Sequence, residues 1–199
     1  MSASLQSIPV IQKQGDDPFL SKGECLKNKL INFWQWAFSD LSNNAIRGVL
    51  AEYIIAYQLG ITEGVRTEWD AYDLETKDGV KLEIKSAAYL QSWEQKEHSA
   101  ISFGIAPTQG WNASTNEYSN EVKRQADIYI FCLLHHKDKL TLNPLDLDQW
   151  TIYLLPTKIL NEKIPMQKTI RLSSLLKLNP IETTFENIES ALKAIANEQ

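Results

Sequence analysis

The chain has 199 residues, a length that suits one domain with a sizeable core. Hydrophobic residues make up 43% of it, which indicates a globular protein rather than a disordered one. The net charge of −5 argues against bulk electrostatic attraction to nucleic acid, although a local basic groove is compatible with that total. The N-terminus lacks a signal-peptide pattern, and no apolar run reaches transmembrane length. We therefore expect a cytoplasmic protein without a membrane partner.

The N-terminal part of the chain predicts an arm followed by two helices. Residues 1–21 are polar and interrupted by prolines and a glycine, so we expect a loosely attached arm, with a single domain over residues 22–199. Residues 23–38 have the apolar spacing of a helix. A second helix is predicted over residues 44–59, with Gly60 as its C-terminal stop.

The second of these helices carries an acidic residue among apolar ones. Residues 48–59 are apolar on nearly every side, which predicts a buried helix, and Glu52 lies within it. A buried carboxylate is costly unless it is paired, hydrogen-bonded or bound to a metal. Two interpretations follow. Glu52 forms a salt bridge to Arg47 or to a lysine of the sheet, or it is an acidic member of a site.

A β-hairpin is predicted over residues 72–86, after a strand expected at residues 65–69. Residues 72–76 and 80–86 alternate polar with apolar side chains. Asp78-Gly79 between them is a strong turn signal, because such a turn needs a residue with positive φ. The second strand places Glu83 and Lys85 on one face, so a carboxylate and an ammonium project side by side.

The length of the hairpin loop decides which aspartate lies beside Glu83. A three-residue loop places Asp73 opposite Glu83, whereas a two-residue loop brings Asp70 to that face, and the sequence leaves both open. Two converging carboxylates repel unless they are protonated or bridged by a cation, and oxygen ligands suit Mg²⁺. Such an ion with a nearby lysine can cleave phosphodiesters. Taken alone, however, Glu-x-Lys on a strand is more often a solvated face.

The rest of the chain predicts a mixture of strands and helices. We expect a strand at residues 100–105, a long polar loop at 107–117 and a helix at 117–125. The nearly continuous apolar run 127–134 predicts a central buried strand. Further strands are expected at 150–155 and 169–172, with a helical turn at 157–160. A capping box at Thr183 and Glu186 opens a final amphipathic helix.

The order of these motifs resembles the PD-(D/E)xK nuclease superfamily, whose fold is called restriction-endonuclease-like. The hairpin is similar to that of restriction-associated members, although Tyr72 stands where the motif has proline. The family pattern is an acidic residue on the first helix, an Asp opening the second strand and (Asp or Glu)-x-Lys on the third. It is matched in order by Glu52, Asp73, Glu83 and Lys85. The resemblance therefore favours Asp73 over Asp70.

The resemblance implies a fold and an activity. The fold would be α/β (α+β), with a central mixed β-sheet flanked by helices, a core at about residues 44–135 and a C-terminal extension at 136–199. The activity would be a metal-dependent nuclease that hydrolyses phosphodiester bonds, in our expectation those of DNA, in restriction, defence or repair. Asp73, Glu83 and the backbone carbonyl of Ile84 would bind Mg²⁺, with Mn²⁺ as a substitute. Glu52 would act through a water or a second ion, and Lys85 would position or deprotonate the attacking water.

Substrate contacts and alternatives complete the expectations. Basic, polar and aromatic residues that would line a nucleic-acid groove are Lys81, Gln91, Trp93, Trp111, Lys123 and Arg124. A double-strand cutter with one site per chain would work as a homodimer. One alternative is a catalytically inactive nuclease-fold protein that serves as a nucleic-acid-binding or assembly subunit. Another is an interaction domain in which Glu52 and Lys85 form a buried ion pair.

Overall fold

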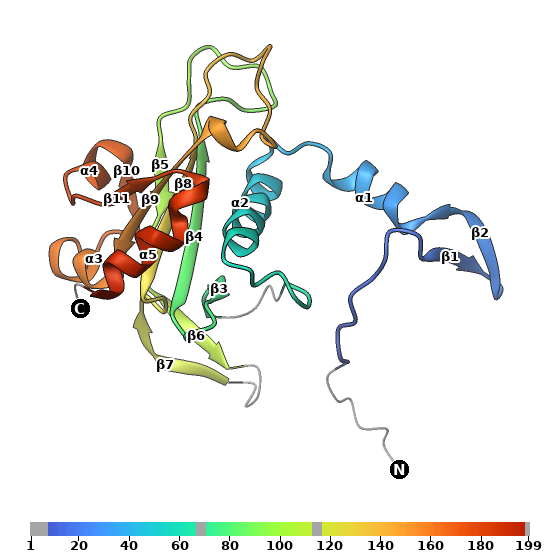
Figure 1. The fold of residues 1–199 in the computed structure, drawn as a ribbon, viewed down its shortest axis with the longest axis horizontal. Coiled ribbons are helices and arrows are strands. Elements are labelled where there is room, and N and C mark those ends of the chain that lie inside the picture. Colours follow the sequence, from blue (N-terminus) through green and yellow to red (C-terminus); the bar gives the residue numbers. More distant parts are fainter. Residues whose placement is uncertain (1–7, 67–70, 113–116, 198–199) are drawn as a thin grey trace. The chain divides into compact units, whose positions relative to one another are not determined.

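The structure is a computed structural model that describes residues 8–66, 71–112 and 117–197 (Figure 1). The chain divides into two compact units. The N-terminal unit comprises residues 1–39 and 62–66, and the sheet unit comprises residues 40–61 and 67–199. Residue 21, after which the sequence predicts the end of an arm, lies within the N-terminal unit.

The N-terminal unit consists of a β-hairpin and a short helix. Strands β1 (Pro18–Ser21) and β2 (Glu24–Lys29) pair antiparallel, and helix α1 runs over Leu30–Phe38. Lys22 and Gly23 join the strands with φ values of 52° and 83°, the positive pair that a two-residue type I′ hairpin turn requires. The helix expected over residues 23–38 is therefore correct only from Leu30 onwards, because this turn directs the preceding residues into a strand.

The sheet unit is built on a five-stranded mixed sheet with the strand order β11-β9-β8-β4-β3. Its strands are β3 (Leu74–Glu75), β4 (Lys81–Ala88), β8 (Ile128–Leu134), β9 (Trp150–Pro156) and β11 (Ile181–Thr183). Strands β4 and β8 are parallel and the other neighbours are antiparallel. Strand β8 is central and wholly buried, as its apolar run predicts. Two strands of this sheet, β9 and β11, come from residues 136–199.

Helices cover both faces of the sheet. Helices α2 (Asn44–Gln58) and α5 (Ile188–Asn197) pack on one face. The other face is covered by α3 (Thr157–Lys163), α4 (Leu172–Leu176) and the short strand pair β5 (Ser102–Gly104) and β10 (Thr169–Arg171). Single 3₁₀ turns precede β9 and α5, at Leu147–Gln149 and Phe185–Asn187. The result is a mixed α+β fold with a core on each side of one sheet.

Strands β6 (Thr108–Asn112) and β7 (Glu117–Lys123) form a separate antiparallel hairpin. The sequence predicts a loop over residues 107–117 and a helix over 117–125. Residues 108–112 and 117–123 are strands instead, and residues 113–116 lie outside the described residues. The pairing between the two strands satisfies their backbone groups and overrides the helical tendency of the second segment. The strand expected at residues 65–69 is also not found in its described part, since Val65 and Arg66 have no regular structure; residues 67–69 lie outside the described residues.

Within the described ranges, no helix combines the length and the apolar character needed to cross a membrane.

Candidate active site

The turn of the β3–β4 hairpin sets the register of the candidate site. The Thr76 N–H donates to the Val80 carbonyl at 2.9 Å, which leaves residues 77–79 as a three-residue loop. Gly79 has a φ of 81°, the conformation that glycine adopts without strain. Beyond the loop, Leu74 lies opposite Leu82. This is the register that brings Asp73 beside Glu83, whereas Asp70 lies outside the described residues.

Asp73 is held against the outer edge of β4. Its N–H donates to the Leu82 carbonyl at 3.0 Å, and its Oδ2 accepts from the Ile84 N–H at 2.7 Å. The Asp73 carboxylate thus takes the position that a longer β3 strand would occupy. Because two backbone hydrogen bonds fix Asp73 to β4, its carboxylate has little freedom to turn away from the site.

Glu83 and Lys85 project from β4 beside this aspartate. The Lys85 Nζ lies 2.5 Å from Glu83 Oε1 and 4.0 Å from Asp73 Oδ2. The side chains of Asp73, Glu83 and Lys85 are 23%, 19% and 30% exposed. They are therefore partly desolvated but still open to a ligand from solvent. Two carboxylates and one ammonium form a compact cluster, which we call the Asp73–Glu83–Lys85 cluster.

Helix α2 supplies the third acidic residue. Glu52 is 9% exposed on the buried face of α2. Its negative charge raises the pKa of both Asp73 and Lys85, so it is electrostatically coupled to the cluster. The structure thus brings Glu52, Asp73, Glu83 and Lys85 into one part of the sheet unit.

The rest of α2 differs from the prediction in one respect. Its limits agree, since Asn43 caps the first turn and Gly60 follows the last with a φ of 62°. Its outer face, however, is open to solvent at Val49, Tyr53 and Tyr57, so the prediction of a helix buried all round is wrong. A single sheet face covers only one side of a helix, whatever the residues on the other side are.

Arg47 on the same helix has partners of its own. Its Nη1 donates to the Ser42 carbonyl at 3.0 Å and to Gln91 Oε1 at 3.4 Å, and its Nη2 donates to Asn44 Oδ1 at 2.7 Å. Burial lowers the pKa of this guanidinium. Arg47 therefore joins the start of α2 to the segment after β4.

Two groups of the cluster have shifted protonation equilibria. Burial, and then the neighbouring Glu83 carboxylate, raise the pKa of Asp73 to about 6, against the opposing effects of Lys85 and the Ile84 N–H. Burial alone would lower the pKa of Lys85, but Glu83, Asp73 and Glu52 together raise it above its ordinary value. At neutral pH Lys85 is an ammonium held among carboxylates, and these carboxylates repel one another.

Tyr129 is a neighbour of the cluster that the sequence did not identify. The parallel register of β4 and β8 pairs Glu83 with Tyr129, so both side chains lie on the same face of the sheet. Tyr129 is 3% exposed, and its ring stacks on Phe131 with centroids 5.9 Å apart. Burial, followed by the charges of Glu83 and Asp73, raises the pKa of its hydroxyl. The hydroxyl therefore stays protonated at neutral pH.

Two of the expected substrate contacts are buried instead. Arg124 is 5% exposed, and its guanidinium donates to the carbonyls of Ile105, Ile164 and Gln167 and to the Asn161 side chain. It therefore holds a loop of the sheet unit and presents no open donor to a phosphate. Gln91 is 7% exposed. Its side-chain oxygen accepts a hydrogen bond from Arg47, and its side-chain nitrogen donates to the Ala88 carbonyl. We correct both assignments to structural roles.

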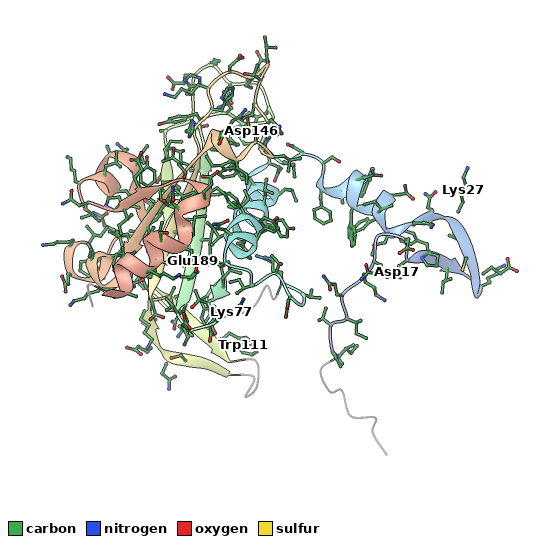
Figure 2. All side chains as sticks on the ribbon, in the orientation of Figure 1. Asp17, Lys27, Lys77, Trp111, Asp146 and Glu189 are labelled. Atoms are coloured by element: carbon green, nitrogen blue, oxygen red, sulfur yellow. The ribbon has the colours of Figure 1, made fainter. Side chains whose placement is uncertain are left out.

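The other expected contacts remain on the surface. The Lys81 Nζ lies 5.1 Å from the centroid of the Tyr72 ring. The Lys123 Nζ forms an ion pair with Glu121 at 2.8 Å, on β7 instead of the expected helix. Trp93 is 53% exposed, and Trp111 lies on β6 (Figure 2). These positions can meet a substrate, and their roles stay predictions.

Among the residues that the structure describes, the acidic side chains do not form a set of three metal ligands. Within the part of the chain that the structure describes, no group of three or more His, Cys, Asp or Glu side chains is placed to hold one ion. In this arrangement Glu52 is not placed as a third ligand beside Asp73 and Glu83. An ion at the cluster would have two carboxylates, with backbone and water oxygens completing its coordination, an arrangement that suits Mg²⁺.

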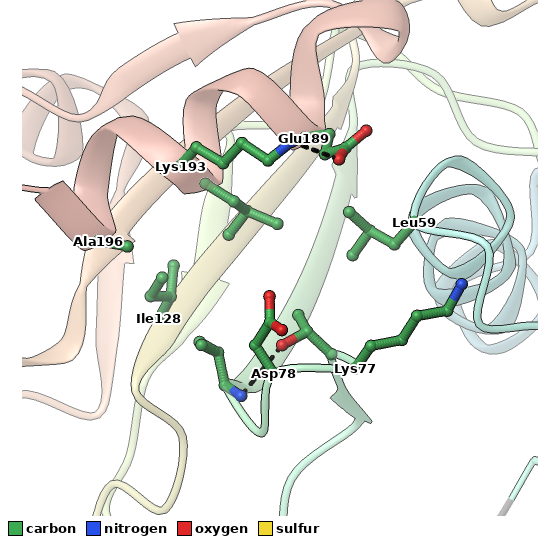
Figure 3. A pocket seen from close by; sticks show the side chains of 10 residues that line it. Leu59, Lys77, Asp78, Ile128, Glu189, Lys193 and Ala196 are labelled. Atoms are coloured by element: carbon green, nitrogen blue, oxygen red, sulfur yellow. Dashed lines mark hydrogen bonds and ion pairs between the residues drawn. The ribbon is translucent and has the colours of Figure 1, made fainter.

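A hollow of about 180 Å³ lies elsewhere, between the hairpin turn and α5 (Figure 3). Leu59, Ile128 and Ala196 contribute apolar wall, while Lys77 and Asp78 come from the turn. Glu189 and Lys193, paired at 2.7 Å, lie along its side. None of the four candidate residues lines this hollow, so it is separate from the cluster.

The geometry of the cluster suits the hydrolysis of phosphate esters. Two carboxylates that can hold a cation, with an ammonium within 4.0 Å of both, are groups that stabilise an attacked phosphate. No curated protein matches the chain. Residues 28–174, nearly three quarters of it and including all four candidate residues, match the family described as bacteriophage T4 endonuclease IV. The chain therefore belongs to the bacteriophage T4 endonuclease IV family, which makes it a nuclease that acts on nucleic acid.

Proposed function

We propose that this nuclease hydrolyses phosphodiester bonds of DNA with the aid of Mg²⁺, at a PD-(D/E)xK-type site formed by Asp73, Glu83 and Lys85. The observation that carries the proposal is the position of the Lys85 Nζ, 2.5 Å from Glu83 and 4.0 Å from Asp73. On this proposal the protein acts in restriction, defence or repair of DNA.

The order of elements around the cluster supports this assignment. Helix α2 with Glu52 comes first, the antiparallel β3–β4 hairpin with Asp73 and Glu-x-Lys follows, and β8 then pairs parallel to β4. We propose that these elements form a restriction-endonuclease-like core. Strand β9 and helix α5 complete it on the far side of β8 and over the α2 face.

The chemistry of the cluster fits a divalent cation. The pKa of Asp73 is raised because burial and the Glu83 carboxylate make its negative charge unfavourable. A bound cation would offset this charge. The Ile84 N–H faces Asp73 on the outer edge of β4. In an extended strand the N–H and C=O of one residue point to the same edge, so the Ile84 carbonyl faces that edge too. When bound, Mg²⁺ would polarise the phosphate and acidify a water.

The residues of the chain would then divide the work. Asp73 and Glu83 hold the ion, and Glu52 orders water beside it from α2. Because its pKa is raised, Lys85 stays an ammonium, which favours orienting the attacking water and offsetting charge on the phosphate over removing a proton. The Tyr129 hydroxyl supplies a further donor on the Glu83 side.

A cleavage assay with a metal titration tests the proposal. Supercoiled plasmid, a single-stranded DNA circle and an RNA transcript are incubated with the protein and Mg²⁺ or Mn²⁺. We expect DNA cleavage that EDTA abolishes and that falls by about 10²–10³-fold in Glu83→Gln, which keeps the size of the side chain but removes its charge. Calorimetry should show Mn²⁺ binding that Glu83→Gln weakens.

The assay also separates the alternatives. Cleavage that Glu83→Gln leaves intact would refute the site, and cleavage of RNA alone would refute the DNA assignment. Mn²⁺ binding at the cluster without cleavage of any of the three substrates would favour a catalytically inactive nuclease-fold subunit that binds or assembles. Absence of both would favour a plain interaction domain.

A further inference from the structure

Arg47 is a buried cation whose hydrogen bonds go to neutral groups. It is 3% exposed, and its acceptors belong to Ser42, Asn44 and Gln91. Its Nε–H is buried and has no hydrogen-bond partner in the described part of the chain. The ion pairs among the described residues do not include Arg47 either. A buried charge is costly unless an opposite charge compensates it, so this guanidinium favours an anion close by.

The guanidinium lies against the first turn of α2, where its Nη2 donates to Asn44 Oδ1 at 2.7 Å. The first N–H groups of a helix have no partner within the helix and form the positive end of its dipole. Asn43 Oδ1 accepts the Ala45 N–H at 3.0 Å, whereas those of Asn44 and Ile46 have no partner among the described residues. We call this turn, together with Arg47, the α2 N-terminal site.

Asp40 is the acidic residue that precedes this site. Its Oδ1 accepts the N–H groups of Ser42 at 3.2 Å and Asn43 at 3.1 Å. This carboxylate is therefore engaged by the turn before the helix and leaves the N–H groups of Asn44 and Ile46 open. Open helix N–H groups beside a buried guanidinium are donors that suit the oxygens of a phosphate.

Helix α2 lies beside β4 and connects this site to the Asp73–Glu83–Lys85 cluster (Figure 1). Ala45 precedes Glu52 by seven residues, so both lie on one side of α2, about 10 Å apart. Gly48 lies between them on that side, and a Cβ there would meet nothing within 4 Å beyond the backbone of the helix. Glu52 is electrostatically coupled to the cluster. An open stripe of small residues thus leads from the α2 N-terminal site towards the cluster.

We propose that the α2 N-terminal site binds a backbone phosphate of the nucleic acid, a few nucleotides from the bond that is cleaved. The position of the cleaved bond rests on the proposed function, which this second contact extends. The N–H groups of Asn44 and Ile46 donate to the phosphate oxygens, and the charge of Arg47 compensates that of the phosphate. Phosphate contacts carry no sequence information, so this one fixes the register of the strand at the cluster.

Ala45→Glu tests the proposal, because it places a carboxylate where the phosphate would bind. An acidic residue in the first turn favours a helix, so this variant keeps the fold, whereas a change at the buried Arg47 risks it. The matched control is Ser190→Glu. It adds the same charge to the exposed first turn of α5, elsewhere in the sheet unit.

Binding is measured by fluorescence anisotropy in EDTA, with a labelled single strand and a labelled duplex of DNA over a series of salt concentrations. Ala45→Glu should weaken binding by about 10-fold at low salt. It should also lower the slope of log K against log salt by about 0.7 for the single strand or about 0.9 for the duplex, the loss of one phosphate contact. Ser190→Glu should change neither quantity. Equal effects of the two variants, or no binding by the wild type, would overturn the proposal.

Neutral methylphosphonate linkages, introduced one at a time, locate the phosphate. One linkage other than the cleaved one should weaken wild-type binding by about 10-fold and have no further effect on Ala45→Glu. If no linkage behaves in this way, the proposal fails, even if inorganic phosphate binds to the wild type and not to Ala45→Glu, because the site then takes a free phosphate. Since no metal or cleavage is involved, such a failure leaves the cluster assignment intact. Cleavage that Glu83→Gln leaves intact would refute the cluster without affecting this binding result.

Discussion

Each of the two units contains a strongly apolar element, but the two elements differ in how far they are buried. All seven residues of β8 are buried, whereas none of the nine residues of α1 is. Strand β8 has a neighbour on each edge and helices on both faces, whereas the described part of the N-terminal unit offers α1 only a two-stranded hairpin. Apolar content therefore shows that an element needs cover, and the number of layers in its own unit decides whether that unit supplies the cover.

This difference in burial also indicates which unit carries the candidate active site. The four candidate residues all belong to the sheet unit, whose central sheet has a core on each face. We therefore expect chemistry and folding stability to depend on the sheet unit. Three predictions can break or sharpen this division.

The largest effect on stability is expected in the core of the sheet unit. Phe131 is fully buried and meets Phe103 edge to face at 5.0 Å. Phe131→Ala should lower the free energy of unfolding by about 3–5 kcal/mol, because it opens a cavity between packed rings. Trp36→Ala should change the free energy of unfolding by less than about 0.5 kcal/mol. Denaturant titration measures both, and equal losses would mean that the N-terminal unit has a core after all.

Removal of the charge on Asp73 should have an intermediate and pH-dependent effect. Its pKa is raised by folding, so the unfolded chain loses the proton first as pH rises, and stability falls between about pH 4 and 6. Asp73→Asn should therefore stabilise the metal-free protein by about 1–3 kcal/mol at pH 7 and have little effect below pH 4. Thermal unfolding at both pH values measures this.

The control for this variant is Asp127→Asn. That carboxylate also accepts a backbone N–H from β4, at 2.9 Å from the Lys81 nitrogen. It should not show the same gain in stability at pH 7. If Asp73→Asn instead destabilises the protein at pH 7, the cluster is a stabilising ion-pair network, as the interaction-domain reading requires.

The smallest effect is expected at Tyr129. Tyr129→Phe keeps the stack on Phe131 and removes only the hydroxyl beside Glu83, so cleavage should fall by about 10-fold. Tyr153→Phe, on β9 opposite Phe131, is a matched control that should cleave normally. Single-turnover kinetics with labelled substrate distinguishes the two. Equal rates for both variants would limit Tyr129 to packing.

Features that are local in sequence could be predicted, and those set by distant pairing could not. The hairpin, the aspartate that faces Glu83 and the limits of α2 all follow from signals within about 15 residues, such as Asp78-Gly79 and Gly60. The neighbour of Glu83 on β8 depends on the parallel register, which no local pattern specifies. The burial of Arg124 likewise depends on carbonyls more than 35 residues away.

The most direct test of the account is single-turnover DNA cleavage by Lys85→Ala beside Lys193→Ala, with Mn²⁺ titrations of both. Each variant removes a lysine from a close ion pair, but only Lys85 lies at the cluster. Lys85→Ala should reduce cleavage by about 10²–10⁴-fold while still binding Mn²⁺, and Lys193→Ala should match the wild type. Cleavage by Lys85→Ala at the wild-type rate would show that the catalytic site lies elsewhere in the chain.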